Sequence, residues 1–118
     1  MAHILVLDDV PEAAVMIGKI LIRKGHEVAT FTEEEEALQY ARSNQVDLAI
    51  LDLKLRTMSG IAVLAALKKT NPATRAIVLT GYPGAETARQ ALSLGASHYC
   101  VKPVDKRELE EKVSQALG

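Results

Sequence analysis

Polar side chains with reactive chemistry follow four of the short apolar runs in this sequence. They are Asp8 and Asp9, Asp52, Thr80 with Gly81, and Lys102 with Pro103. In an open parallel α/β sheet, ligands bind beyond the carboxyl ends of the strands. If the apolar runs are strands of one such sheet, all of these residues lie along the same edge of it.

The carboxylates indicate a metal site. Two carboxylates about 4 Å apart repel each other by about 4 kcal/mol at an effective dielectric constant of 20, so a cluster of Asp8, Asp9 and Asp52 requires a cation. Mg²⁺ is a hard ion that binds a few carboxylates and retains waters, and it suits this cluster best, with Mn²⁺ as the alternative. Taken singly, these residues have ordinary structural interpretations: Asp9 as a helix cap, Asp8 as a solvated residue and Asp52 as a turn residue.

Lys102 and Thr80 add donors for an anion. A cis peptide bond between Lys102 and Pro103 would aim the ammonium at the carboxylates, while Thr80 offers a hydroxyl and Gly81 an open backbone amide. A metal, an amine, a hydroxyl and an amide can together surround a phosphoryl group, whose transfer depends on positioning and charge neutralisation. Asp52 is the expected nucleophile, which would form an aspartyl phosphate. Considered alone, Lys102 can be a solvated lysine at a strand end, and Thr80-Gly81 is by default a turn.

Short buried strands must position these side chains. Continuous apolar runs are typical of parallel strands that are covered on both faces, whereas strands with one wet face alternate. Such runs lie at residues 4–7, 28–31, 48–51, 77–79 and 99–101.

The segments between the runs predict helices. Thr32 and Asp105, each followed by a Glu three residues later, have capping-box spacing, and Gly25 and Gly95 stand where left-handed helix ends are expected. We therefore expect an α/β fold, with a doubly wound five-stranded parallel sheet and helices on both faces. Apolar residues recur at helical spacing in five segments: Ala14, Ile17 and Leu21; Ala37, Leu38 and Ala41; Ile61, Leu64 and Ala65; Ala88, Ala91 and Leu92; and Leu109, Val113 and Ala116.

The composition is that of one small globular domain. The 118 residues are 48% hydrophobic and 25% charged, which predicts a single domain over residues 1–118 with no output domain of its own. A net charge of -1 argues against direct contact with nucleic acid or a membrane surface. A single cysteine, Cys100, excludes an internal disulfide. No signal peptide or membrane-length apolar run is evident, so we expect a cytoplasmic location.

The sequence resembles the receiver domains of two-component response regulators over its whole length, from ILVLDD through LAILDL and IVLTGY to YCVKPVD. The resemblance implies a flavodoxin-like strand order of 2-1-3-4-5. It also implies that Asp52 accepts a phosphoryl group from a phosphohistidine on a sensor histidine kinase or phosphotransfer protein. Mg²⁺ would be held by Asp9, Asp52 and the backbone carbonyl of Lys54, with Asp8 acting through a bound water, and Lys102 would pair with a phosphoryl oxygen.

The resemblance further implies a switch. Thr80 would hydrogen-bond the phosphoryl group, and its movement would be coupled to an aromatic residue, here Tyr99. The surface around residues 88–92, 99–101 and 109–116 would then change to control an effector protein or attached output domain, and it is also a possible homodimer interface. Lys54 and Tyr82 occupy positions that tune hydrolysis of the acyl phosphate in this family, and a bulky Tyr82 would shield it from water.

A few positions depart from the usual pattern of these receivers. Leu55 and Arg56 stand where many have a Met-Pro pair, Val104 replaces a common aromatic residue after Lys-Pro, and Val10 stands where a polar residue is frequent. None of these changes removes a reactive group.

Three other functions are open to a chain with these residues. A receiver fold can serve as a constitutive interaction module. A phosphatase of the haloacid dehalogenase type also forms an aspartyl phosphate, but it requires a second acid where this chain has Lys54. A flavodoxin-like redox module would bring a flavin phosphate against Asp8 and Asp9, which repel it. We expect a signalling domain and no enzyme beyond slow self-catalysed phosphotransfer and dephosphorylation.

The other reactive residues predict no second site. The three histidines, His3, His26 and His98, lack metal-ligand spacing and are expected at strand edges or ends. Cys100 is expected to be a buried thiol. The acidic run at residues 33–36 is expected to be the solvated start of a helix, where negative charge opposes the helix dipole favourably.

Overall fold

The computed structural model describes residues 1–53, 59–81 and 84–118. Lys54, Tyr82 and the Leu55-Arg56 pair, to which the sequence assigned roles or departures, lie outside the described residues. Within these ranges, strands and helices alternate. The elements are β1 (His3–Leu7), α1 (Pro11–Arg23), β2 (Glu27–Phe31), α2 (Glu34–Ser43), β3 (Leu48–Asp52), α3 (Gly60–Thr70), β4 (Arg75–Thr80), α4 (Ala85–Ser93), β5 (His98–Val101) and α5 (Lys106–Leu117).

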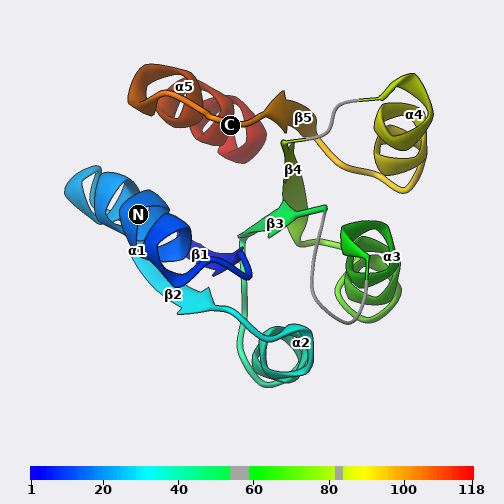
Figure 1. Cartoon of the computed structure of the whole chain (residues 1–118). Helices are drawn as coiled ribbons and strands as arrows, with labels where there is room; N and C mark the ends of the chain where they lie inside the picture. Colours follow the sequence, from blue (N-terminus) through cyan, green and yellow to red (C-terminus); the bar gives the residue numbers. More distant parts are fainter. Residues whose placement is uncertain (54–58, 82–83) are drawn as a thin grey trace.

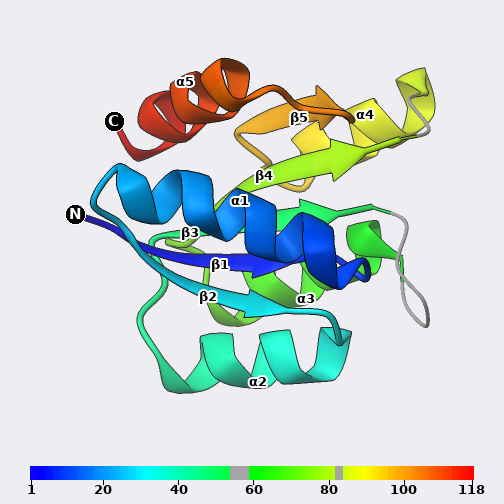
Figure 2. The same cartoon turned by 60° about the vertical axis from the view of Figure 1, so that its left-hand side comes forward.

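All of the strands pair in parallel in a single sheet of order β2-β1-β3-β4-β5. Helices α1 and α5 cover one face of this sheet, and α2, α3 and α4 cover the other (Figures 1 and 2). The doubly wound architecture and the strand order expected from the sequence are thereby confirmed.

The continuous apolar runs are explained by these two covered faces. Along β1, Leu5 and Leu7 belong to the core on the α2–α4 side, whereas Ile4 and Val6 belong to the core on the α1/α5 side. Successive side chains of a strand point to opposite faces, so both parities must be apolar where helices cover both faces. The same rule makes β3 buried throughout its length.

The predicted helical stripes are correct for three of the helices and partly wrong for two. In α3 the buried side includes Val63 and Leu67, and Ala65 is exposed. In α4 Ala91 is buried and Leu92 is exposed. Neighbouring helical residues lie about 100° apart, so a short helix that presents one small residue to the sheet turns the next one toward solvent.

Helix ends agree with the sequence at most positions. Asp105 caps α5 by accepting a hydrogen bond from the Glu108 backbone N–H at 2.9 Å. Gly25 and Gly95 have φ of +92° and +101°, in the left-handed region that favours glycine. Thr32 was wrong as a cap, because α2 begins one residue later with Glu33 at its N-cap.

Two acidic residues also depart from expectation at helix starts. Glu34, in the run expected to be solvated, is only 3% exposed, whereas the other residues of that run, Glu33, Glu35 and Glu36, are exposed as expected. Helix α1 has Val10 at its N-cap and no side-chain cap, so Asp9 does not serve that purpose.

The remaining reactive residues lie where the sequence indicated. His3 and His98 begin strands β1 and β5 and His26 precedes β2, while Cys100 is buried. Among the described residues, no helix combines the length and the apolar character that crossing a lipid bilayer requires.

Candidate functional site

The polar residues predicted to share an edge lie at the carboxyl ends of neighbouring strands. Asp52 ends β3 and Thr80 ends β4, while Asp8 directly follows β1 and Lys102 directly follows β5. The register places Asp52 beside Leu79 and Thr80 beside Val101. Parallel pairing thus brings residues from four separate chain segments to one edge of the sheet (Figure 2).

Asp8 is held through both of its carboxylate oxygens. It is 1% exposed. Its Oδ1 accepts a hydrogen bond from the Val10 backbone N–H at 3.0 Å, and its Oδ2 accepts one from the Lys102 ammonium at 2.8 Å. The first of these contacts is an Asx-type turn between residues two apart. A buried carboxylate with both oxygens engaged is fixed in orientation.

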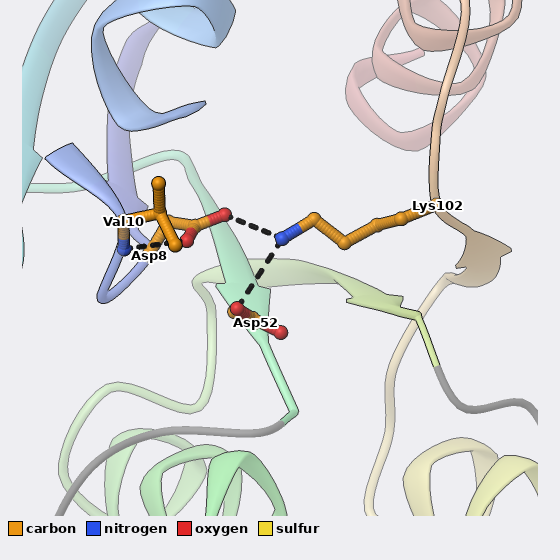
Figure 3. A network of polar contacts seen from close by, with 4 residues as sticks. All are labelled: Asp8, Val10, Asp52 and Lys102. Atoms are coloured by element: carbon orange, nitrogen blue, oxygen red, sulfur yellow. Dashed lines mark hydrogen bonds and ion pairs between the residues drawn. The ribbon is translucent and has the colours of Figure 1, made fainter. Parts of the chain in front are cut away.

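Lys102 reaches across the site and joins two strands. Its Nζ lies 2.8 Å from Asp8 Oδ2 and 3.3 Å from Asp52 Oδ2, and Figure 3 shows its extended side chain ending between the two carboxylates. The Lys102–Pro103 peptide bond is cis. The ammonium that follows β5 therefore pairs with two buried acids, one just after β1 and the other at the end of β3.

The pKa of Lys102 reflects this position. Burial alone would lower the pKa of the ammonium, but the hydrogen bond that it donates to Asp8 and the negative charge of Asp52 outweigh burial, so the pKa is raised from its usual 10.5. Lys102 remains charged at all physiological pH values.

Asp9 completes an acidic cluster with Asp8 and Asp52. Each of the three offers one carboxylate oxygen, and these oxygens all lie within 4.8 Å of one another. Asp8 and Asp52 are buried and Asp9 is half-buried. A set of carboxylate oxygens that includes a partly exposed residue fits a hard divalent cation that keeps some of its waters.

Thr80 and Tyr99 face the opposite side of the sheet from Asp52. Asp52 points to the same face of the sheet as Ile50, two residues earlier, which lies in the core under α1 and α5. Thr80 points to the same face as Val78, which lies in the core under α2, α3 and α4. Val78 is the register partner of Tyr99. Thr80 thus lies at the same edge of the sheet as the acidic residues, but its side chain points to the face that α4 covers.

Tyr99 contacts the start of α4. Its hydroxyl lies 3.3 Å from the Gly84 backbone nitrogen and 3.3 Å from Thr87 Oγ1. Gly81 and Pro103, the residues expected to support Thr80 and Lys102, are both exposed, and a Cβ added to Gly81 would meet nothing within 4 Å.

Sequence reasoning missed three contributors to the site. The Val10 N–H could have been found, since an Asp two residues before a backbone donor is a common turn pattern. Thr87 gave no local signal, and Gly60 stood out only as the glycine that receivers carry after the loop containing Leu55 and Arg56. Gly60 donates its N–H to the Leu53 carbonyl at 2.8 Å and matters through a contact between α3 and the end of β3, which only the fold creates.

These observations define the class of protein: a doubly wound α/β domain with a lysine-bridged acidic pocket at the carboxyl edge of its sheet. Residues 4–114 match the model of the response regulator receiver domain family, and the chain belongs to that family. It is a receiver domain of two-component signalling, as its sequence motifs indicated.

Individual relatives agree with this assignment. The transcriptional regulatory protein ZraR of Escherichia coli is 35% identical over 115 residues, which are 98% of this chain and 26% of ZraR. A CheY-like receiver domain protein of Methanospirillum hungatei superposes with a TM-score of 0.95 at 32% identity, covering 99% of this chain and 94% of that one.

A response regulator of Burkholderia pseudomallei, solved with a phosphorylated aspartic acid, a calcium ion and citrate, gives a TM-score of 0.88 at 33% identity over 100% of this chain and 67% of that one. The chain thus spans about a quarter of the length of the ZraR relative and most of the length of the receiver structures.

Proposed function

We propose that Asp52 is the phosphoacceptor of this receiver domain and that it takes its phosphoryl group from a phosphohistidine on a sensor histidine kinase or phosphotransfer protein. The observation that carries the proposal is the Lys102 ammonium, held 3.3 Å from Asp52 and 2.8 Å from Asp8. An ammonium in that place can neutralise negative charge that develops on a phosphoryl group attached to Asp52.

The chemistry requires little beyond positioning. A carboxylate oxygen of Asp52 bonds to phosphorus while the phosphorus–nitrogen bond of the donor breaks, and the electron pair of that bond stays on the imidazole nitrogen. Nothing is oxidised or reduced. Lys102 pairs with a phosphoryl oxygen, and the Thr80 hydroxyl, at the end of the neighbouring strand β4, donates to another.

Asp9 and Asp52 are the residues that would hold Mg²⁺ or Mn²⁺, with Asp8 contributing through a water. A bound divalent ion supplies neutralisation of the phosphoryl oxygens and lowers repulsion between donor and acceptor. Support comes from the oxygen cluster within 4.8 Å and from the Burkholderia relative that carries a phosphorylated aspartic acid and a calcium ion. The carbonyl of Lys54, implied as a further ligand by the sequence, lies outside the described residues.

The phosphorylated domain acts by changing the surface formed by α4, β5 and α5. Thr80 and Tyr99 connect the site to that surface, because both side chains face the α4 side of the sheet. The partner is an effector protein or an attached output domain, and a homodimer through the same surface is a further possibility that size measurements can test. The domain catalyses no reaction other than its own slow phosphorylation and dephosphorylation, and it works in the cytoplasm.

Acetyl phosphate with Mg²⁺ provides the direct test. We expect wild-type protein to gain the mass of one phosphoryl group, labile at alkaline pH as an acyl phosphate is, and Asp52→Asn to gain none, because the amide is not a nucleophile. Omission of Mg²⁺ should abolish labelling of the wild type. Intact-mass spectrometry measures both effects.

Asp105→Asn is the matched control for that experiment. Asp105 caps α5 and asparagine caps equally well, so this variant should label like the wild type. A wild-type chain that gains no adduct from acetyl phosphate or from a kinase, or an Asp52→Asn chain that still gains one, would contradict the assignment of Asp52.

A further inference from the structure

A small apolar cavity lies between α1 and the start of α5, two elements that pack on the same face of the sheet (Figure 1). Its volume is about 160 Å³. Met16 and Ile17 line it from α1, Leu79 lines it from β4, and Val104 and Leu109 line it from the segment after β5. Among the described residues, none of the three clustered aspartates lines this cavity. It is therefore a feature of the core under α1 and α5, separate from the acidic cluster.

The side chains around this cavity offer almost nothing to which a polar molecule could bind. Lys102 is the one polar side chain among the described residues that line it. The Lys102 ammonium is already paired with Asp8 and Asp52 (Figure 3). A water molecule held inside a protein needs two to four polar partners. The cavity therefore suits an apolar molecule better than it suits water.

The positive charge of Lys102 distinguishes between the molecules that could enter. An anion would have to draw the ammonium away from Asp8 and Asp52, and two buried carboxylates would then lose their counter-charge. The face of an aromatic ring is attracted to a cation, and this attraction leaves both ion pairs in place. Met16 adds a thioether, which makes favourable contacts with aromatic rings. These groups favour an uncharged aromatic ring over an anion.

The size of the cavity corresponds to a single ring. An apolar protein cavity of about 150 Å³ is large enough to hold benzene. Val104, which lines the cavity, stands where receivers commonly have an aromatic residue, so this chain has a branched side chain of three carbon atoms in place of a ring. The unfilled space is thus matched in size to a ring that the chain itself does not supply.

We propose that the cavity between α1 and α5 is a binding site for a small, uncharged molecule with one aromatic ring. The ring packs against Ile17 and Leu109 and lies beside Lys102. Binding requires neither Mg²⁺ nor a phosphoryl group, so the site does not rest on the function proposed above.

Benzene is the probe for this site, and methyl NMR of the full chain in sealed tubes locates it. We expect nuclear Overhauser effects between the benzene protons and the methyl groups of Ile17 and Leu109. Leu64, in the core on the opposite face of the sheet, should show none. The dissociation constant should be about 0.1–1 mM. At ten times that concentration, benzene should lower the equilibrium constant for unfolding in urea about elevenfold.

Two substitutions fill the cavity from opposite sides. Val104→Phe places a ring of the protein in the space, and Ala13→Leu enlarges a residue of α1 that also lines the cavity. Each should weaken benzene binding at least about tenfold, because closely packed side-chain atoms exclude the ring. Val101→Phe is the matched control. It adds the same ring at a residue that is 45% exposed and does not line the cavity, and it should bind benzene as the wild type does.

Benzoate tests the choice of an uncharged ligand, because it carries a carboxylate on the same ring. It should bind at least about tenfold more weakly than benzene, and benzoate binding as tight as benzene binding would overturn the assignment to an uncharged ring. The site itself is overturned if benzene at 10 times the expected upper dissociation constant, about 10 mM, gives no effect at Ile17 and Leu109, or if a folded Val104→Phe or Ala13→Leu binds benzene with wild-type affinity. Should one of these variants not fold, the other variant and the wild-type contacts decide.

Discussion

Lys102 is the residue on which the charge balance of the site depends. Asp8 is 1% exposed and Asp52 5%, and the carboxylates of both face one ammonium. Burying charges is costly unless they are paired, and removing one partner leaves the others uncompensated. The same arrangement that prepares the site for a phosphoryl group therefore also stabilises the fold in its absence.

We expect Lys102→Met to lower the free energy of unfolding by about 2–3 kcal/mol near pH 7 without divalent ions, because two buried carboxylates lose their counter-charge. The pKa of Lys102 is raised in the folded state above its usual 10.5, so its stabilising effect is complete below about pH 10.5 and is lost as the pH rises through the higher folded value. Urea unfolding at a series of alkaline pH values measures the difference between wild type and variant.

That difference should hold steady up to about pH 10 and shrink above pH 10.5. Lys106→Met, which removes an exposed lysine at the start of α5, serves as the control and should cost less than about 0.5 kcal/mol. Equal stability of wild type and Lys102→Met near pH 7, or a gap between them that persists unchanged at high pH, would show that the ammonium does not stabilise the fold through these carboxylates.

At the scale of helices and strands, the contact between the start of α3 and the end of β3 positions Asp52. Gly60 is the first residue of α3, and a Cβ added to it would lie 2.4 Å from the Asp52 carbonyl oxygen and 2.4 Å from Leu53 Cα. Both neighbours are backbone atoms, which cannot move aside alone. Only a glycine lets the helix approach the strand this closely.

Gly60→Ala should therefore lower the free energy of unfolding by about 1–3 kcal/mol and slow the phosphorylation of Asp52, since α3 and the end of β3 must separate. Urea unfolding and the rate of labelling by acetyl phosphate measure the two effects. Gly81→Ala is the comparison, because a Cβ there meets nothing within 4 Å. Labelling and stability of Gly60→Ala equal to those of Gly81→Ala would show that the close approach is not needed.

At the scale of the whole molecule, two helical layers seal both faces of the sheet. Cys100 lies in β5 and is 2% exposed, in the core shared with α1 and α5. Burial raises the pKa of its thiol, with a further contribution from the Glu108 carboxylate. A buried thiol with a raised pKa reacts only when the surrounding structure opens.

We expect iodoacetamide to modify Cys100 in the native protein at least about a hundredfold more slowly than a free thiol at the same pH, and the rate should rise with urea in parallel with unfolding. Because Cys100 is the single cysteine of the chain, one adduct in the intact mass reports the reaction directly. Fast native modification would mean that β5 opens without the rest of the sheet.

The features of the fold and site that the sequence predicts are those that depend on residues close together in the chain. The strands were predictable because burial on both faces demands continuous apolar runs, and the Asp105 cap because its signal spans four residues. Thr32 and Leu92 were misjudged because the exact start and rotation of α2 and α4 depend on what each helix packs against. The free-energy differences between alternative start residues within one polar stretch are too small for the local sequence to select one of them.

The sequence by itself determined the class of fold and the set of reactive residues, since periodicity and the residues after each strand are local properties. Only the tertiary structure decided that one ammonium contacts both Asp8 and Asp52, that Gly60 must lie against the backbone at the end of β3, and that the Tyr99 hydroxyl contacts the start of α4. Each of these joins residues far apart in the chain, and their distances follow from sheet register and helix packing, which no single segment encodes.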